Sequence, residues 1–131
     1  MSFPLPEKIA YHFLDKTYRG FKTLQDDKKL TLNSNAQFLS IGELSEGRKV
    51  EFAWIFDDGV FKKLRFKAFG DPYLIGSLSW FCFTMEGNSF ESLSKLSFPQ
   101  IAKVLEIPNS KLSCLMLMDD LIQSLLANIK R

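Results

Sequence analysis

The feature that most constrains the fold is a pair of alternating apolar segments between residues 49 and 69. In the first segment every second residue is apolar: Val50, Phe52, Trp54 and Phe56. Asp57-Asp58-Gly59 follows, and Asp-Gly is a strong signal for a tight turn between antiparallel strands. The second segment alternates again, with Val60, Leu64, Phe66 and Ala68 on one side and basic Lys63, Arg65 and Lys67 on the other. This spacing predicts a half-buried hairpin with a basic outer face.

Helical patterns lie on both sides of this hairpin. Residues 6–18 are predicted to form a helix, because Pro6 suits a first turn and apolar residues recur at i+4. A nearly all-apolar stretch from Pro72 to Glu86 predicts a buried helix that ends at Gly87. Further helices are predicted over 90–96, from the capping box at 97–100 to about 106, and over 110–129, with a short strand at 37–41. The order predicts one α+β domain over residues 1–131, with an N-terminal helix, a small antiparallel sheet and C-terminal helices in two layers.

Composition excludes several classes of protein. The chain has 131 residues and a net charge of +2, too small to indicate nucleic-acid binding through bulk electrostatics. No run of about 18 uncharged apolar residues occurs, and the first residues lack the pattern of a signal peptide, so we expect no membrane association. Two cysteines cannot build a disulfide framework or a complete zinc site. We therefore expect a cytoplasmic protein.

The residue pattern gives little support for an enzyme. The single histidine, His12, is not placed beside either cysteine by the sequence, and no glycine-rich phosphate loop is present. Two residues are better candidates for chemistry. Cys114 is predicted in the first turns of the last helix, just after Lys111, where the helix dipole and the ammonium favour a thiolate; the alternative is a buried cysteine that acts as a small apolar residue. Asp71 precedes Pro72, and its alternative role is that of an ordinary helix N-cap.

The surface offers a second set of candidates. Lys63, Arg65 and Lys67, with neighbouring Lys62, form a basic stripe that would bind an acidic partner or simply keep a sheet face soluble. The chain also contains 13 phenylalanines, which indicates a bulky core and allows a hydrophobic partner face or a homodimer.

Five segments give the chain a resemblance to a known family. They are EKIAYHF (Glu7–Phe13), RFKAFG (Arg65–Gly70), EGNSFESL (Glu86–Leu93), IAKVLEIP (Ile101–Pro108) and KLSCLMLMDDLI (Lys111–Ile122). In order and spacing they resemble the NifU/IscU-type scaffolds for iron–sulfur cluster assembly, over nearly the whole chain. The resemblance implies an α+β scaffold that works with a cysteine desulfurase or another assembly protein.

The positions of the family's cluster ligands have mostly changed. By the resemblance they fall at Ser45, Gly47, Asp71, Ser113 and Cys114, so only the last keeps the family's residue. The family's chaperone-recognition segment falls at residues 107–111 and keeps one proline and Lys111. A [2Fe–2S] cluster needs two protein ligands per iron, and Asp71 with Cys114 supplies half of that set. Two chains that pair these residues would reach four ligands.

Two functions are compatible with this pattern. In the first, a divergent scaffold binds iron or a labile cluster weakly, or accepts sulfur on Cys114 from a desulfurase. In the second, an interaction module has kept the fold, lost the cluster chemistry and binds no cofactor. The candidate partner-binding residues are His12, Lys63, Arg65, Lys67 and Lys111.

Overall fold

The computed structural model describes residues 5–21 and 36–129. Its helices and strands follow the predicted order. They are α1 (Glu7–Leu14), β1 (Gln37–Glu43), the 3-10 helix η1 (Leu44–Glu46), β2 (Arg48–Asp57), β3 (Val60–Phe69), α3 (Pro72–Met85), α4 (Phe90–Ser94), α5 (Phe98–Val104), the 3-10 helix η2 (Asn109–Leu115) and α6 (Met116–Asn128). No helix in the described part is long and apolar enough to cross a membrane.

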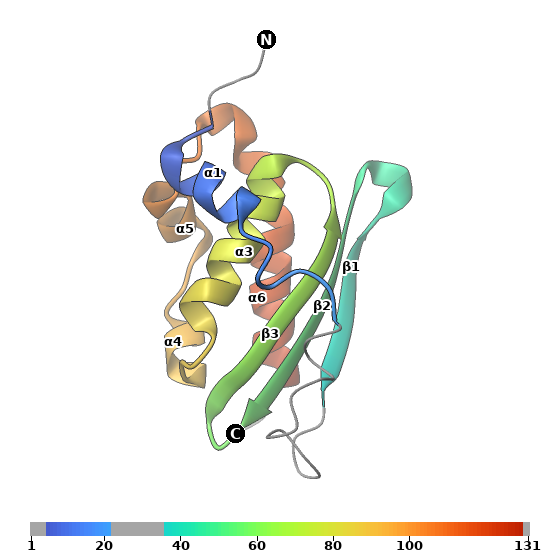
Figure 1. Cartoon of the computed structure of the whole chain (residues 1–131), viewed down its shortest axis with the longest axis vertical. Helices are drawn as coiled ribbons and strands as arrows, with labels where there is room; N and C mark the ends of the chain where they lie inside the picture. The colour runs from blue at the N-terminus through green and yellow to red at the C-terminus, as the bar shows by residue number, and fades with distance from the viewer. Residues whose placement is uncertain (1–4, 22–35, 130–131) are drawn as a thin grey trace.

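The strands form an antiparallel sheet in the order β1-β2-β3, and the helices gather on one side of it (Figure 1). The hairpin between β2 and β3 has the predicted turn. Asp58 and Gly59 both have positive φ, 54° and 75°, as a two-residue turn with the hairpin's twist requires. Phe52 stands opposite Phe66, so the predicted apolar faces coincide there. Near the turn the register shifts between Ile55 and Phe56, and Phe61 is fully buried in place of Val60, which the alternation had put on the apolar face. The α+β two-layer prediction is confirmed.

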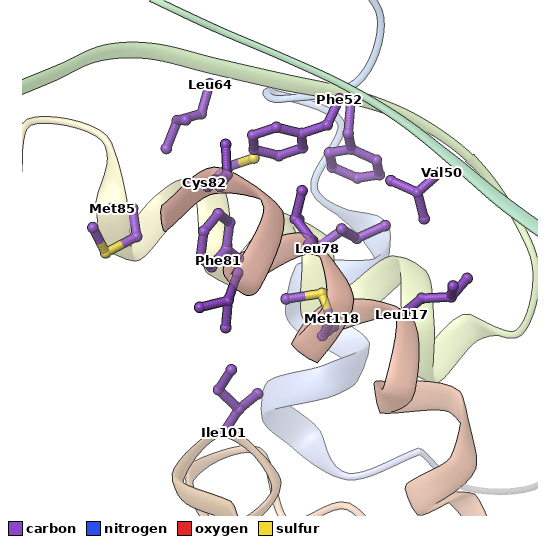
Figure 2. Packing of buried hydrophobic residues seen from close by; sticks show 14 of the residues in the cluster. Val50, Phe52, Leu64, Leu78, Phe81, Cys82, Met85, Ile101, Leu117 and Met118 are labelled. Atoms are coloured by element: carbon purple, nitrogen blue, oxygen red, sulfur yellow. The ribbon is translucent and has the colours of Figure 1, made fainter. Parts of the chain in front are cut away.

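The main core lies between the sheet and α3. Val50, Phe52 and Leu64 point from the sheet toward Leu78, Phe81 and Cys82 of α3 (Figure 2). Helix α6 lies beside α3, contacts β1 of the sheet and adds Leu117 and Met118 to this core, and α5 packs against α6 and adds Ile101. Helix α3 is apolar nearly all round, as predicted, and it can therefore be enclosed by the sheet and by other helices. Cys82 is fully buried here as a core residue.

The outer face of the hairpin is less basic than predicted. Arg65 is only 5% exposed, because its guanidinium forms an ion pair with Glu86 at 2.9 Å and lies over the Tyr18 ring. Ala53 and Ile55 on the same strand pair are also buried, against Phe21 and Ala36. The expectation of a continuous exposed stripe through Arg65 is therefore wrong.

The first helix is shorter than predicted and ends at Leu14. Asp15 accepts hydrogen bonds from the Thr17 backbone N–H and hydroxyl, and this local turn competes with further helix. The chain then pairs with the edge of β3, where Phe66 N–H donates to the Tyr18 carbonyl and Gly20 N–H donates to the Phe66 carbonyl. Backbone groups that a longer helix would use are thus satisfied by the sheet.

The last predicted helix divides into two parts. Residues 109–115 wind as a 3-10 helix, and the α-helix begins only at Met116. Cys114 therefore does not lie in the first turns of an α-helix, as the sequence predicted. Tighter winding of this kind is common where a helix begins.

Candidate functional site

Asp71 stands at the junction between β3 and α3. Its carboxylate caps the helix by accepting a 2.8 Å hydrogen bond from Tyr73 N–H, with Pro72 in the first turn, so the predicted N-cap role is confirmed. The other carboxylate oxygen lies 3.1 Å from the Lys111 ammonium, 40 residues further along the chain. One side chain therefore ties the start of α3 to η2.

Cys114 lies beside this pair in a cavity of about 140 Å³. The cavity is lined by residues from three separate segments: Glu46, Gly47 and Arg48 at the start of β2, Asp71 and Leu74 at the start of α3, and Cys114 in η2. Cys114 is half-buried and lines the cavity together with Asp71, whose carboxylate is near enough to influence the thiol electrostatically. The structure thus brings together the two residues that the sequence analysis favoured for chemistry.

The electrostatics of Cys114 differ from the prediction. Partial burial raises the pKa of the thiol, and the Asp71 carboxylate raises it further. The charges of Lys111 and Arg48 act in the opposite direction, but the pKa remains above its ordinary value. At rest Cys114 is therefore a thiol, and the predicted stabilisation of a thiolate is wrong. The Asp71 hydrogen bond also raises the pKa of the Lys111 ammonium, which stays charged.

The other ligand positions implied by the resemblance are only partly gathered here. Gly47 lines the cavity but has no side chain that could bind a metal. Ser45 and Ser113 are exposed, and the Ser113 backbone carbonyl accepts a 3.4 Å hydrogen bond from Arg48. Arg48 is a site residue that the sequence analysis missed. Its position just before the predicted hairpin gave no signal that it would reach this cavity.

The donor set does not fit a cluster bound by a single chain. Within residues 5–21 and 36–129, no three His, Cys, Asp or Glu side chains are grouped so that they could hold a metal ion. Asp71 and Cys114 offer one carboxylate and one thiol. The carboxylate already accepts hydrogen bonds from the Lys111 ammonium and from Tyr73 N–H at the start of α3. Four ligands are needed for a [2Fe–2S] cluster.

A larger cavity of about 540 Å³ lies next to the first and shares Asp71 with it. Its walls are mainly apolar: Leu5, Pro72, Tyr73 and Pro108, with Ser110 and Lys111 as further polar residues. The Lys111 side chain is 41% exposed, so it is accessible as one of the predicted partner-binding residues.

The remaining candidate partner-binding residues lie elsewhere. His12 is buried between the rings of Tyr11 and Phe83, and burial lowers its pKa, so the ring is neutral at pH 7. Lys63 is half-buried, whereas Lys67 is exposed with its ammonium over the Phe21 ring. These residues do not lie beside Asp71 and Cys114. Of the candidate partner-binding residues, Lys111 is the one that also contacts Asp71.

Comparisons with known proteins point in one direction. The chain is 30% identical over 125 residues to "Iron sulfur cluster assembly protein 1, mitochondrial" from Debaryomyces hansenii, a match that covers 94% of this chain and 69% of that protein. It is 32% identical over 74 residues to the iron–sulfur cluster assembly scaffold protein IscU from Haemophilus influenzae, covering 56% of this chain and 59% of that one. No protein-family model matches the chain.

A solved structure supports the same fold. The chain superposes with a TM-score of 0.63 on a crystal structure described as that of a putative iron–sulfur cluster assembly scaffold protein for the SUF system, from Fervidobacterium islandicum. The match covers 90% of this chain and 93% of the other at 15% sequence identity. The near full-length relative and the shared architecture agree with the resemblance of the sequence segments. The chain is therefore a divergent member of the NifU/IscU-type family of iron–sulfur cluster assembly scaffold proteins.

Proposed function

We propose that this protein acts in iron–sulfur cluster assembly by accepting sulfur on Cys114, and that one chain does not hold a cluster by itself. The sulfur donor would be a persulfide carried by a cysteine desulfurase. The observation that carries the proposal is that Cys114 and Asp71 line one cavity in a scaffold-family fold, with the Lys111 ammonium held against Asp71 beside it. The role is that of a carrier and not of an enzyme, and we expect it in the cytoplasm, where thiols stay reduced.

Sulfur acceptance needs fewer groups than cluster binding. A single accessible cysteine is enough to form a persulfide, whereas a cluster needs four ligands. Cys114 is the cysteine that can do this, because it is half-buried at a cavity while Cys82 has no exposure at all. The site therefore has the cysteine that persulfide formation needs, but it has fewer ligands than cluster binding needs.

The transfer balances without an added oxidant or reductant. The Cys114 thiol loses its proton, and the thiolate attacks the outer sulfur of the donor persulfide. The bond between Cys114 Sγ and that sulfur forms as the donor's S–S bond breaks. The donor cysteine leaves as a thiolate and takes up a proton. Cys114 then carries the persulfide, and the donor has returned to a thiol.

Neighbouring charges have distinct roles in this step. Lys111 and Arg48 favour the anionic sulfur that develops on Cys114, whereas partial burial and, after it, the Asp71 charge raise the pKa of the resting thiol and keep it protonated. Asp71 also fixes the Lys111 ammonium at 3.1 Å and so keeps a cation beside the cavity. The same carboxylate and Cys114 would bind ferrous iron only weakly, because two donors are few and Lys111 competes for one of them.

Mass spectrometry tests the proposal. The protein is incubated anaerobically with glutathione persulfide, and in parallel with a cysteine desulfurase and cysteine; peptides are then mapped for one added sulfur atom. We expect the addition on Cys114 and none on Cys82, which serves as the buried control within the same chain. Cys114→Ala should abolish the addition while leaving the fold intact. A wild-type protein without added sulfur on Cys114 under either condition would overturn the proposal.

The change at four of the five ligand positions supports a second candidate function, an interaction module that has kept the fold without the chemistry. A residue that rests as a neutral thiol is compatible with a purely structural role. Under this alternative, Cys114→Ala would retain full activity in the cell. Under sulfur acceptance, the same variant would lose it.

A further inference from the structure

The cavity beside Cys114 carries one cation and one anion that are not paired with other residues. Glu46 and Arg48 stand on either side of Gly47 in the sequence, and both line the cavity. Neither takes part in an ion pair with another residue in the described part of the chain. Arg48 is half-buried and donates a 3.4 Å hydrogen bond to the Ser113 carbonyl, whereas Glu46 is exposed. A guanidinium and a carboxylate are therefore available at the same cavity.

The third charged residue of the cavity, Asp71, is already engaged. Its carboxylate accepts hydrogen bonds from Tyr73 N–H at 2.8 Å and from the Lys111 ammonium at 3.1 Å. The Lys111 charge therefore offsets that of Asp71. A ligand in the cavity would meet Arg48 and Glu46 as the charges that still lack a partner.

The size of the cavity limits what it can hold. Its volume of about 140 Å³ lies below the range of about 300–1,000 Å³ that is typical of sites for drug-sized ligands. It corresponds to the space of about five water molecules, at about 30 Å³ each. A Cβ at Gly47 would meet no other atom within 4 Å, so the space between the two charged residues is open. The cavity therefore suits a molecule of the size of one amino acid better than a peptide.

We propose that this cavity binds a free amino-acid persulfide, such as cysteine persulfide, as a direct sulfur donor to Cys114. The inference rests on the proposed function and names a second class of donor besides a persulfide carried by a desulfurase. The α-carboxylate of the ligand would pair with Arg48 and its α-ammonium with Glu46, while its persulfide faces the Cys114 thiol. The presence of both charges at one small cavity favours a zwitterion over a ligand with a single charge.

The transfer from this donor balances without a further reactant. The Cys114 thiol loses its proton, and its sulfur attacks the outer sulfur of the ligand. The bond between the two sulfurs of the ligand breaks as the new S–S bond forms. Cysteine leaves as a thiolate and takes up a proton, and Cys114 carries the persulfide.

An unreactive analogue tests binding separately from sulfur transfer. S-methylcysteine carries the same two charges but has no sulfur atom to transfer. We expect it to slow the alkylation of Cys114 by iodoacetamide several-fold at saturation, because it occupies the cavity. 3-(Methylthio)propionate lacks the ammonium and 2-(methylthio)ethylamine lacks the carboxylate, so each should protect the thiol much less. Mass spectrometry of the Cys114 peptide measures the rate of alkylation.

Substitutions test each charge in turn. Arg48→Gln and Glu46→Gln each remove one ion pair with the ligand, and we expect each to raise the concentration of S-methylcysteine that gives half-maximal protection about fivefold or more. Lys49→Gln is the matched control, because Lys49 is the next charge along β2 and does not line this cavity. The Arg48 charge also lowers the pKa of Cys114, so each variant is compared with its own alkylation rate without ligand. Circular dichroism checks that each variant is folded.

Sulfur transfer is measured in parallel with cysteine persulfide and with glutathione persulfide. We expect the rate of sulfur addition to Cys114 to saturate with cysteine persulfide and to stay proportional to concentration with glutathione persulfide, which is too large for the cavity. A wild type that S-methylcysteine does not protect, or equal protection in the wild type, Arg48→Gln and Glu46→Gln, would overturn this inference. The proposed function would still stand if a desulfurase adds sulfur to Cys114. A chain that accepts sulfur from no donor would overturn both.

Discussion

At the scale of single residues, Asp71 organises the site. It caps α3, holds the Lys111 ammonium and lines the same cavity as Cys114, whose pKa its charge raises. Asparagine caps a helix as well as aspartate does but carries no charge. Asp71→Asn therefore separates the electrostatic role of this residue from its structural role.

We predict that Asp71→Asn lowers the pKa of Cys114, because it removes the carboxylate that raises it. At pH 8 a larger fraction of the thiol is then ionised, and alkylation of Cys114 by iodoacetamide should be several-fold faster than in the wild type. Lys111→Met removes a charge that lowers this pKa, so the reaction should become slower. The pH profile of the alkylation rate measures both shifts. Unchanged profiles in both variants would refute this account of the site.

The sequence predicted part of this site. Asp71 could be identified because an aspartate before a proline is a local helix-start signal, and Cys114 because of its proximity to Lys111. The state of the thiol could not be predicted, since it depends on partial burial and on a carboxylate far away in the sequence. Arg48 was missed for the same reason: its contact with the Ser113 carbonyl joins residues 65 positions apart.

At the scale of elements, α1 packs on α3 through a glycine. A Cβ at Gly76 would stand 3.0 Å from the Ile9 backbone carbonyl oxygen, closer than side-chain carbons normally approach. Ile9 is fully buried at this contact. The absence of a side chain at Gly76 therefore sets the distance between the two helices.

We predict that Gly76→Ala destabilises the protein by about 1–3 kcal/mol, because the methyl group forces α1 away from α3. Helix propensity alone predicts the opposite, a gain of about 1 kcal/mol, so the sign of the change is informative. Gln123→Ala, at an exposed position of α6, is the control and should change little. Denaturant unfolding measures the difference, and a Gly76→Ala variant more stable than the wild type would contradict the packing described here.

Elements with strong local signals were predictable, and those that depend on distant partners were not. The hairpin followed from alternation and from Asp58-Gly59, and α3 followed from its continuous apolar pattern. The end of α1 did not, because the chain after Leu14 leaves the helix to pair with Phe66 of β3. Arg65 was assigned to an exposed face, since no local pattern indicates the ion pair with Glu86.

At the scale of the whole molecule, the chain has kept the scaffold fold, whereas most of the family's ligand positions have changed. The core between the sheet and α3 is one continuous cluster, and the chain superposes on a scaffold structure over 90% of its length. A fold depends on many apolar contacts and tolerates the exchange of a few polar side chains, whereas a cluster site depends on four or five specific donors. The chain can therefore keep the architecture while its site retains one cysteine and one carboxylate.

The most direct test of this account is anaerobic reconstitution with ferrous iron, sulfide and a reductant, followed by desalting, measurement of iron and sulfide per chain, and a visible spectrum. The Cys114→Ala variant, treated in the same way, gives the background level of iron and sulfide. We predict that the wild type elutes colourless, with iron and sulfide close to that background. Stoichiometric iron and sulfide, with sulfide-to-iron charge-transfer bands that disappear in Cys114→Ala, would contradict the account and show that the reduced ligand set still holds a cluster.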